Sequence, residues 1–357
     1  MTAVRKKISR RRTPLQWLFE APSIGKMAPG TAVFVYGLLL FWTLVVLFPL
    51  YWVLITSFKT ALDVNNGPVF LPWVDFTPSL HAWRELLVID YEDTLRSYIN
   101  SIVIATLSTA LCVAVGSMAA YALARITYKP KFGNILLFVL AMLGGCYVVW
   151  KAGVDWKIAM TAAFAIWFFL LKSVGRFFKK SVGNGDILFW MISQRILPPI
   201  VTVVPIYMMF QNLKMLDTHL ALILTYTVVN LPIVVWLLYD FISGIPIELE
   251  ESAQLDGASR FRTFWEIVLP LAKPGLAATT LLVLILAWNE YILAVFLSTS
   301  NAQTIPILVA AMNAGERGIL WWSMCVVIII MIIPVVFMAI LLQRFISKGV
   351  LLGAVKG

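Results

Sequence analysis

A charged segment between two long apolar runs holds the residues of this chain best suited to an ionic contact with another molecule. Glu251, Ser252 and Ala253 place a carboxylate beside two small side chains. A carboxylate can pair with a cation, and small neighbours let a second surface approach closely. Asp256 and Gly257 then add another acid and a turn residue. This combination predicts the recognition of a partner.

Residues 243–274 are typical of a short helix that ends at a glycine. Pro246 suits the first turn of a helix, and acids soon after it favour the positive end of the helix dipole. Those acids are Glu248, Glu250 and Glu251. Gly257 suits the left-handed conformation that closes many helices. An ordinary solvated loop between two spans is the alternative.

A second, amphipathic helix is expected directly after this turn. Ser259 can cap its beginning, and Pro270 should terminate it. Its apolar side chains recur at helical spacing and should share one face. They are Phe261, Phe264, Trp265 and Val268. A helix of this kind can lie against a membrane surface.

Composition identifies an integral membrane protein. The chain has 61% hydrophobic and 13% charged residues and a mean hydropathy of +0.89, which excludes an ordinary soluble domain. Cys112, Cys146 and Cys325 stand singly in apolar segments, and His81 and His219 are isolated. No metal site and no catalytic cluster is expected from these spacings.

Apolar runs of spanning length predict an all-α polytopic bundle of about eight transmembrane helices. The expected spans are residues 33–58, 97–123, 134–150, 158–174, 187–210, 220–242, 275–297 and 319–344. Basic residues crowd the tail 1–30, whereas residues 59–96 carry six acids against three bases. Because cationic loops remain inside, both termini and the 243–274 loop are expected in the cytoplasm. The transmembrane domain would cover 31–357.

Residues 133–180 contain two shorter apolar segments separated by Lys151, Asp155 and Lys157. We interpret them as an inserted transmembrane hairpin. A re-entrant or interfacial hairpin is the alternative, given their modest length. Either arrangement leaves residues 243–274 on the cytoplasmic side.

The loop also resembles the EAA loop of ABC-importer permeases, whose pattern is Glu-Ala-Ala, three residues, Gly, nine residues, Ile-x-Leu-Pro. Ser252 departs from it where Ala is usual. Other segments are similar to the maltose-type carbohydrate class of that family: 78–87, 96–101, 119–125, 195–199, 287–291 and 353–357. The resemblance implies a permease subunit with the MetI-like helical bundle, a multi-pass protein of the bacterial inner membrane.

In that family the loop is a coupling helix seated on a cytoplasmic ATPase subunit. Carried over, its docking surface would comprise Glu251, Ser252, Ala253, Asp256, Gly257 and Ala258. Ile267, Leu269 and Pro270 would hold the loop against the bundle. The C-terminal Lys356 and Gly357 would also reach the ATPase dimer.

The resemblance implies several partners: a second homologous permease, the ATPase dimer, a periplasmic or lipid-anchored binding protein, and the lipid bilayer. Because the chain contains no Gly-x-x-x-x-Gly-Lys-Ser/Thr loop, we expect it to bind no cofactor, with ATP and Mg used by the ATPase. The net charge of +10 does not predict nucleic-acid binding, since basic residues cluster before the first span.

Polar residues within spans are costly and often functional, so they are candidates for a substrate path. They are Gln194, Arg195, Asn230, Asn289, Glu290 and Tyr291. Alternatively, these residues hydrogen-bond only to one another or to backbone carbonyls that a helix break leaves free.

The resemblance implies a sugar or polyol as substrate, with a polyamine, phosphate or amino acid as the alternative within the class. A secondary carrier would need buried ionisable relays, which are few here. Which of the two permeases holds the substrate stays open.

Overall fold

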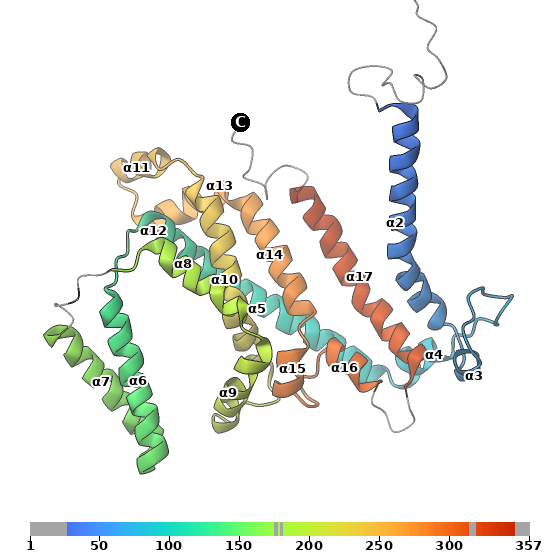
Figure 1. Cartoon of the computed structure of the whole chain (residues 1–357), viewed down its shortest axis with the longest axis horizontal. Coiled ribbons are helices and arrows are strands. Elements are labelled where there is room, and N and C mark those ends of the chain that lie inside the picture. Colours follow the sequence, from blue (N-terminus) through green and yellow to red (C-terminus); the bar gives the residue numbers. More distant parts are fainter. Residues whose placement is uncertain (1–26, 175–177, 179–180, 314–318, 347–357) are drawn as a thin grey trace, which may run out of the picture. The chain divides into compact units, whose positions relative to one another are not determined.

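The computed structural model describes residues 27–174, 178, 181–313 and 319–346, and it is helical (Figure 1). Within these ranges only two isolated β-bridges occur, and no strand forms. This confirms the all-α fold class. The described residues divide into two compact units, those within 1–91 and 312–330 and those within 92–311 and 331–357.

Six helices of the described residues are long and apolar enough to cross a bilayer. They are α2 (Pro29–Thr56), α5 (Tyr91–Arg125), α6 (Phe132–Ala152), α7 (Trp156–Ser173), α10 (His219–Ser243) and α17 (Trp321–Ile346). Two bent helix pairs raise the number to eight if each pair crosses once. The expected eight spans therefore agree with the upper count, and the side on which each terminus lies stays a prediction.

The expected span 187–210 is bent, because the chain turns by 92° within it. Helix α8 (Asn184–Ser193) passes through the 3-10 turn η3 (Gln194–Ile196), and α9 (Pro199–Asn212) begins afterwards. Pro198 is extended, with ψ of 133°, and Pro199 starts the new helix. A residue before proline avoids helical geometry, so the Pro-Pro pair imposes the break.

The expected span 275–297 is also interrupted. Helix α14 (Lys273–Trp288) ends before Asn289, and a short α15 (Ile292–Leu297) follows. On its other side, α14 is bent by 79° from the helical run Arg260–Leu271. A further short helix, α16 (Ile305–Ala311), precedes the described part of α17.

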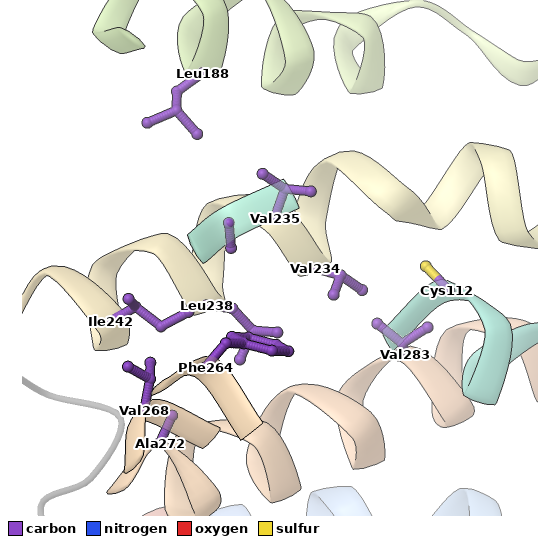
Figure 2. Close-up of a cluster of buried hydrophobic side chains, with 11 residues drawn as sticks. Cys112, Leu188, Val234, Val235, Leu238, Ile242, Phe264, Val268, Ala272 and Val283 are labelled. Atoms are coloured by element: carbon purple, nitrogen blue, oxygen red, sulfur yellow. The ribbon is translucent and has the colours of Figure 1, made fainter. Parts of the chain in front are cut away.

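The core of the larger unit surrounds α10, which packs against α14, α8 and α15. Buried apolar side chains from α5, α8, α10 and α14 meet in one cluster with three from the 243–274 loop, Phe264, Val268 and Ala272 (Figure 2). Leu238 and Ile242 of α10 lie beside them in this view. The loop is thus packed into the bundle core, which connects its position to that of the membrane helices.

The smaller unit contains α2, the loop after it and the first turns of α17. That loop includes α3 (Ala61–Asn65), α4 (His81–Arg84) and the π-helical η1 (Glu85–Ile89). Thr60 and Asp63 cap α3 reciprocally, and Asp75 accepts hydrogen bonds from the Phe70 and Leu71 amides. Carboxylates in a polar loop therefore order its turns.

The predicted hairpin forms as α6 and α7, which pack on each other (Figure 1). Gly153 closes α6 in the left-handed conformation, and the Asp155 side chain caps α7 by accepting from the Lys157 amide. Its helices are confirmed, whereas its transmembrane placement and the domain limits 1–30, 31–357, 133–180 and 243–274 stay predictions.

Gly116 sets the close approach of α5 to α10, because an added Cβ would lie 2.5 Å from Val234 Cγ1. We expect Gly116→Val to reduce the free energy of unfolding by about 1–3 kcal/mol, the usual range for overpacking. The midpoint of denaturant unfolding can be measured with a thiol-reactive dye that reports exposure of buried Cys112, in a Cys146→Ser background. Gly144→Val is the control, since a Cβ added there would meet no neighbouring side chain of the described residues within 4 Å. Equal midpoints for the two variants would contradict the prediction.

Candidate functional site

The first half of the 243–274 loop is helix α11 (Glu248–Leu255), with three acids in its first turn as expected. Pro246 lies two residues before this helix, so its predicted place inside the first turn is wrong. Gly257 has a φ of +88°, which favours glycine, and confirms the predicted left-handed turn. The turn closes where the Ala258 amide donates to the Ala253 carbonyl at 2.9 Å.

The second half begins with Ser259, whose hydroxyl caps α12 (Arg260–Thr263) as predicted. The chain then forms the π-helical η4 (Phe264–Val268) and α13 (Leu269–Leu271). The prediction that Pro270 terminates the helix is therefore wrong. Proline is tolerated in the first turn of a helix, and here it stands near the start of α13 after the π-helical segment.

The four apolar residues of this helical run do not share one face, contrary to the prediction. Phe264 and Val268 are buried in the core, whereas Phe261 and Trp265 are exposed. Each pair is four residues apart, so the run carries one apolar stripe inward and another outward. The inward stripe attaches the loop to the bundle, and the outward stripe is available to lipid.

The predicted docking residues lie largely on the exposed side of α11 and its turn. Glu251, Ser252, Asp256 and Gly257 are exposed, and Ala253 and Ala258 are half-buried. Leu255 is 89% exposed. The sequence interpretation missed this apolar tip, although its place between Ala253 and Gly257 was a usable signal.

The predicted attachment residues are less buried than their neighbours. Ile267 and Leu269 are half-buried and Pro270 is exposed, whereas Phe264 and Val268 are fully buried. Attachment therefore depends mainly on two residues that were predicted only as part of an apolar face. Lys356 and Gly357 lie outside the described residues.

The strongest polar contact of the loop involves Glu250, directly before the predicted docking residue Glu251. Its side chain is 3% exposed and accepts from Arg125 Nε at 2.6 Å through Oε1. Its other oxygen, Oε2, accepts from the Tyr121 hydroxyl at 2.9 Å. Consecutive helical residues point about 100° apart. Glu250 thus faces the bundle, while Glu251 faces solvent.

Arg125 extends this network to the end of α10. Its Nη2 donates to the carbonyls of Ile242 and Ile245, at 2.9 and 2.8 Å. Carbonyls at a helix C-terminus lack helical partners, so a guanidinium there satisfies them and complements the dipole. One side chain therefore joins α5, α10 and α11.

We call Tyr121, Arg125 and Glu250 the loop-anchoring triad. The sequence analysis considered Glu250 only as one of three helix-dipole acids, and Arg125 only within the family-like segment 119–125. A signal was present, since Tyr121 and Arg125 are four residues apart and share a face at the end of their helix. Which of the three acids would turn inward depended on the register of α11.

Two of the predicted substrate-path residues meet at the break between α8 and α9. Arg195 Nη2 donates to Asn230 Oδ1 at 3.0 Å, and Asn230 Nδ2 donates to the Tyr226 carbonyl. A cavity of about 290 Å³ lies beside them, lined by Gln194 and Arg195. Amide and guanidinium groups here border an otherwise largely apolar hollow.

The other three residues of that prediction lie at the break between α14 and α15. Asn289 donates to the Ile285 carbonyl, and Glu290 Oε1 accepts from the Leu293 amide, which caps α15. The Glu290 carbonyl accepts from the Tyr226 hydroxyl at 3.3 Å. Asn289 and Tyr291 are exposed. The polar groups of Asn289 and Glu290 are thus engaged in ordering a helix break.

Comparison with known families identifies the class of this bundle. The profile of the family described as "Binding-protein-dependent transport system inner membrane component" matches residues 173–352. That range includes the 243–274 loop and both helix breaks.

Individual relatives extend the similarity over most of the chain. The chain is 28% identical to the probable ABC transporter permease protein y4oR of Sinorhizobium fredii, covering 89% of this chain and 94% of that protein. It is 31% identical to the trehalose/maltose transport system permease protein MalG of Thermococcus litoralis, covering 88% and 93%. A crystal structure of a bacterial ABC transporter that imports the acidic polysaccharide alginate has the same fold, at 20% identity and a TM-score of 0.58, covering 88% and 95%.

The loop-anchoring triad yields a stability prediction. Glu250→Gln should lower the free energy of unfolding by about 3–5 kcal/mol, because it leaves Arg125 buried without its counter-charge. Thermal unfolding of the purified protein measures the loss. Glu266→Gln is the matched control, since its i,i+4 pair with Arg262 is exposed and worth at most about 0.5 kcal/mol. A Glu250 variant as stable as the control would mean that the triad does not hold the loop.

Proposed function

Since the chain belongs to the family of binding-protein-dependent transport system inner membrane components, we propose that it forms half of the transmembrane path of an ABC importer for a carbohydrate. A member of this family is a multi-pass inner-membrane transport subunit and not an enzyme. The proposal assigns residues 243–274 as the loop through which ATP hydrolysis on separate subunits drives transport.

The observation that carries this proposal is the two-sided character of α11. Its inner side is joined to α5 and α10 by the buried Glu250 carboxylate. Its outer side offers Glu251, Ser252 and the exposed Leu255. A helix held this firmly on one side and free on the other can pass a displacement from a partner to the bundle.

The mechanism follows from these attachments. ATP and Mg would bind the partner ATPase dimer, whose closure displaces α11. Because the loop-anchoring triad ties α11 to the ends of two membrane helices, those helices move with it. Glu251 would pair with a cation of the ATPase, and Leu255 would fill an apolar pocket there. Interactions of this kind often dominate an interface.

The remaining partners follow from the family assignment. A second, homologous permease would complete the path, and a periplasmic or lipid-anchored binding protein would deliver the solute. The C-terminal Lys356 and Gly357 would contribute a further contact to the ATPase dimer. Nucleic acid has no part in this assembly, and the bilayer surrounds it.

A carbohydrate is the solute best supported. MalG of Thermococcus litoralis is named for trehalose and maltose. In this chain, the cavity beside the α8–α9 break places Gln194 and Arg195 against apolar walls. Sugars present hydroxyls and apolar ring faces together, so such a lining suits them. Asn230 would orient the Arg195 guanidinium toward the path.

The coupling assignment can be tested with Glu251→Lys. We expect the variant to insert normally but to retain its ATPase partner at least about tenfold less tightly, because a required charge is reversed at the contact. Co-purification of the ATPase from membranes and substrate-stimulated ATP hydrolysis are the measurements. Asp93→Lys, an exposed reversal in the first turn of α5, is the control. Full transport and unchanged ATPase binding by Glu251→Lys would refute the assignment.

The path assignment can be tested by filling the cavity. Thr202 lines it, whereas Val204 of the same helix is exposed and lies outside its lining. We expect Thr202→Trp to lower the uptake rate severalfold without loss of ATPase binding, and Val204→Trp to transport normally. Uptake of radiolabelled sugar into proteoliposomes containing the assembled complex measures both. Normal uptake by the Thr202 variant would exclude this cavity from the path.

A further inference from the structure

A second cavity, of about 340 Å³, lies in the smaller unit where α2 ends. Its walls come from α2, from the loop that follows and from the first turns of α17. Trp52 and Val53 contribute from α2, and Trp321 and Ile328 from α17. The transport mechanism above does not use this cavity, so its lining calls for a separate explanation.

Lys59 supplies a buried cation to this cavity. The residue is 2% exposed, and its Nζ donates to the Val69 carbonyl at 2.7 Å. The Trp52 ring centroid lies 4.2 Å from Nζ. Within the described part of the chain, no carboxylate lies at ion-pair distance from this ammonium. A buried charge without a counter-charge is costly.

The two acids of the neighbouring loop are engaged elsewhere. Asp63 accepts from the Thr60 amide and hydroxyl, and Asp75 from two backbone amides. Burial lowers the pKa of the Lys59 ammonium below its ordinary value, despite these acids nearby. An anion entering the cavity would therefore relieve a cost that the protein alone leaves in place.

Thr56 adds an unsatisfied hydroxyl to the same wall. The residue is 4% exposed and lines the cavity, yet its Oγ1 has no hydrogen-bond partner among the described residues. A buried polar group without a partner costs about 1–3 kcal/mol. Thr56 and Lys59 are three residues apart at the end of α2. Together they offer hydrogen bonds to one acceptor-rich group.

Apart from Val64 and Gly67 of the loop, the rest of the lining is apolar and belongs to α2 and α17. Val53 and Trp52 on α2, and Met324 and Ile328 on α17, run from the polar end of the cavity along the spans. A small soluble anion would leave these walls uncovered. A molecule with an anionic head and a hydrocarbon chain matches both parts of the cavity.

We propose that this cavity binds an anionic phospholipid, with its phosphate against Lys59 and Thr56 and an acyl chain along α2 and α17. The proposal places the site at the membrane interface, because it lies at the end of the apolar helix α2. Lipid headgroups occur at that depth of a bilayer. The bound lipid would hold the end of α2 to the start of α17.

The test places the assembled complex in nanodiscs of phosphatidylglycerol and phosphatidylcholine. The complex is then released gently, and native mass spectrometry identifies the lipids that stay bound to it. The wild type should retain phosphatidylglycerol in preference to phosphatidylcholine. Lys59→Met should weaken this retention roughly tenfold or more, the effect of losing a charged hydrogen bond. Thr56→Val should weaken it less. Lys214→Met, an exposed cation in the other unit, should change nothing.

Val53→Phe keeps both polar groups and fills the apolar part, so it tests the site even if Lys59→Met fails to fold. Loss of retention in this variant supports the proposal. Equal retention of phosphatidylglycerol by Lys59→Met and the wild type overturns it, as does equal retention of the two lipids by the wild type. Cross-linking of Val53→Cys to the second permease, in place of lipid, would identify a protein contact and also refute it.

Discussion

A single buried ion pair, Glu250 with Arg125, determines how the 243–274 loop relates to the membrane helices. The carboxylate uses both oxygens inside the protein, one for Arg125 and one for Tyr121. The guanidinium in turn binds two carbonyls at the end of α10. Breaking such a pair exposes each partner to the full cost of an uncompensated charge. The loop is therefore held to the bundle by polar contacts as well as by Phe264 and Val268.

The pair also explains why two adjacent glutamates have different roles. Glu250 points into the bundle, and Glu251 points out of it. Their separation needs only the rotation of about 100° between neighbours on a helix. A single register of α11 therefore buries the anchoring carboxylate of Glu250 and exposes the side that we propose for docking. A slip of one residue would bury the Glu251 carboxylate and expose that of Glu250.

Much of this arrangement was predictable from sequence, because it depends on local chemistry. The Gly257 turn, the Ser259 cap, the α6–α7 hairpin and the all-α class follow from backbone preferences and apolar run lengths. Non-local contacts were not predictable. The burial of Glu250 depends on its contacts with α5, and the split of the apolar residues into a buried and an exposed stripe depends on how the loop packs on the bundle. The Pro198-Pro199 pair is a local signal for a break, but the size of the bend, 92°, cannot be read from it.

The broken helix at Pro198-Pro199 has a consequence for what can pass beside it. Neither proline has an N–H to donate, so neither can make the helical hydrogen bond to the carbonyl four residues before it. Next to them the Arg195 guanidinium provides donors. A hydroxyl group both donates and accepts, and it can therefore exchange its bonds to water for this pair without a change of charge. On the proposed path, the helix break would thereby give a passing solute a local substitute for solvent.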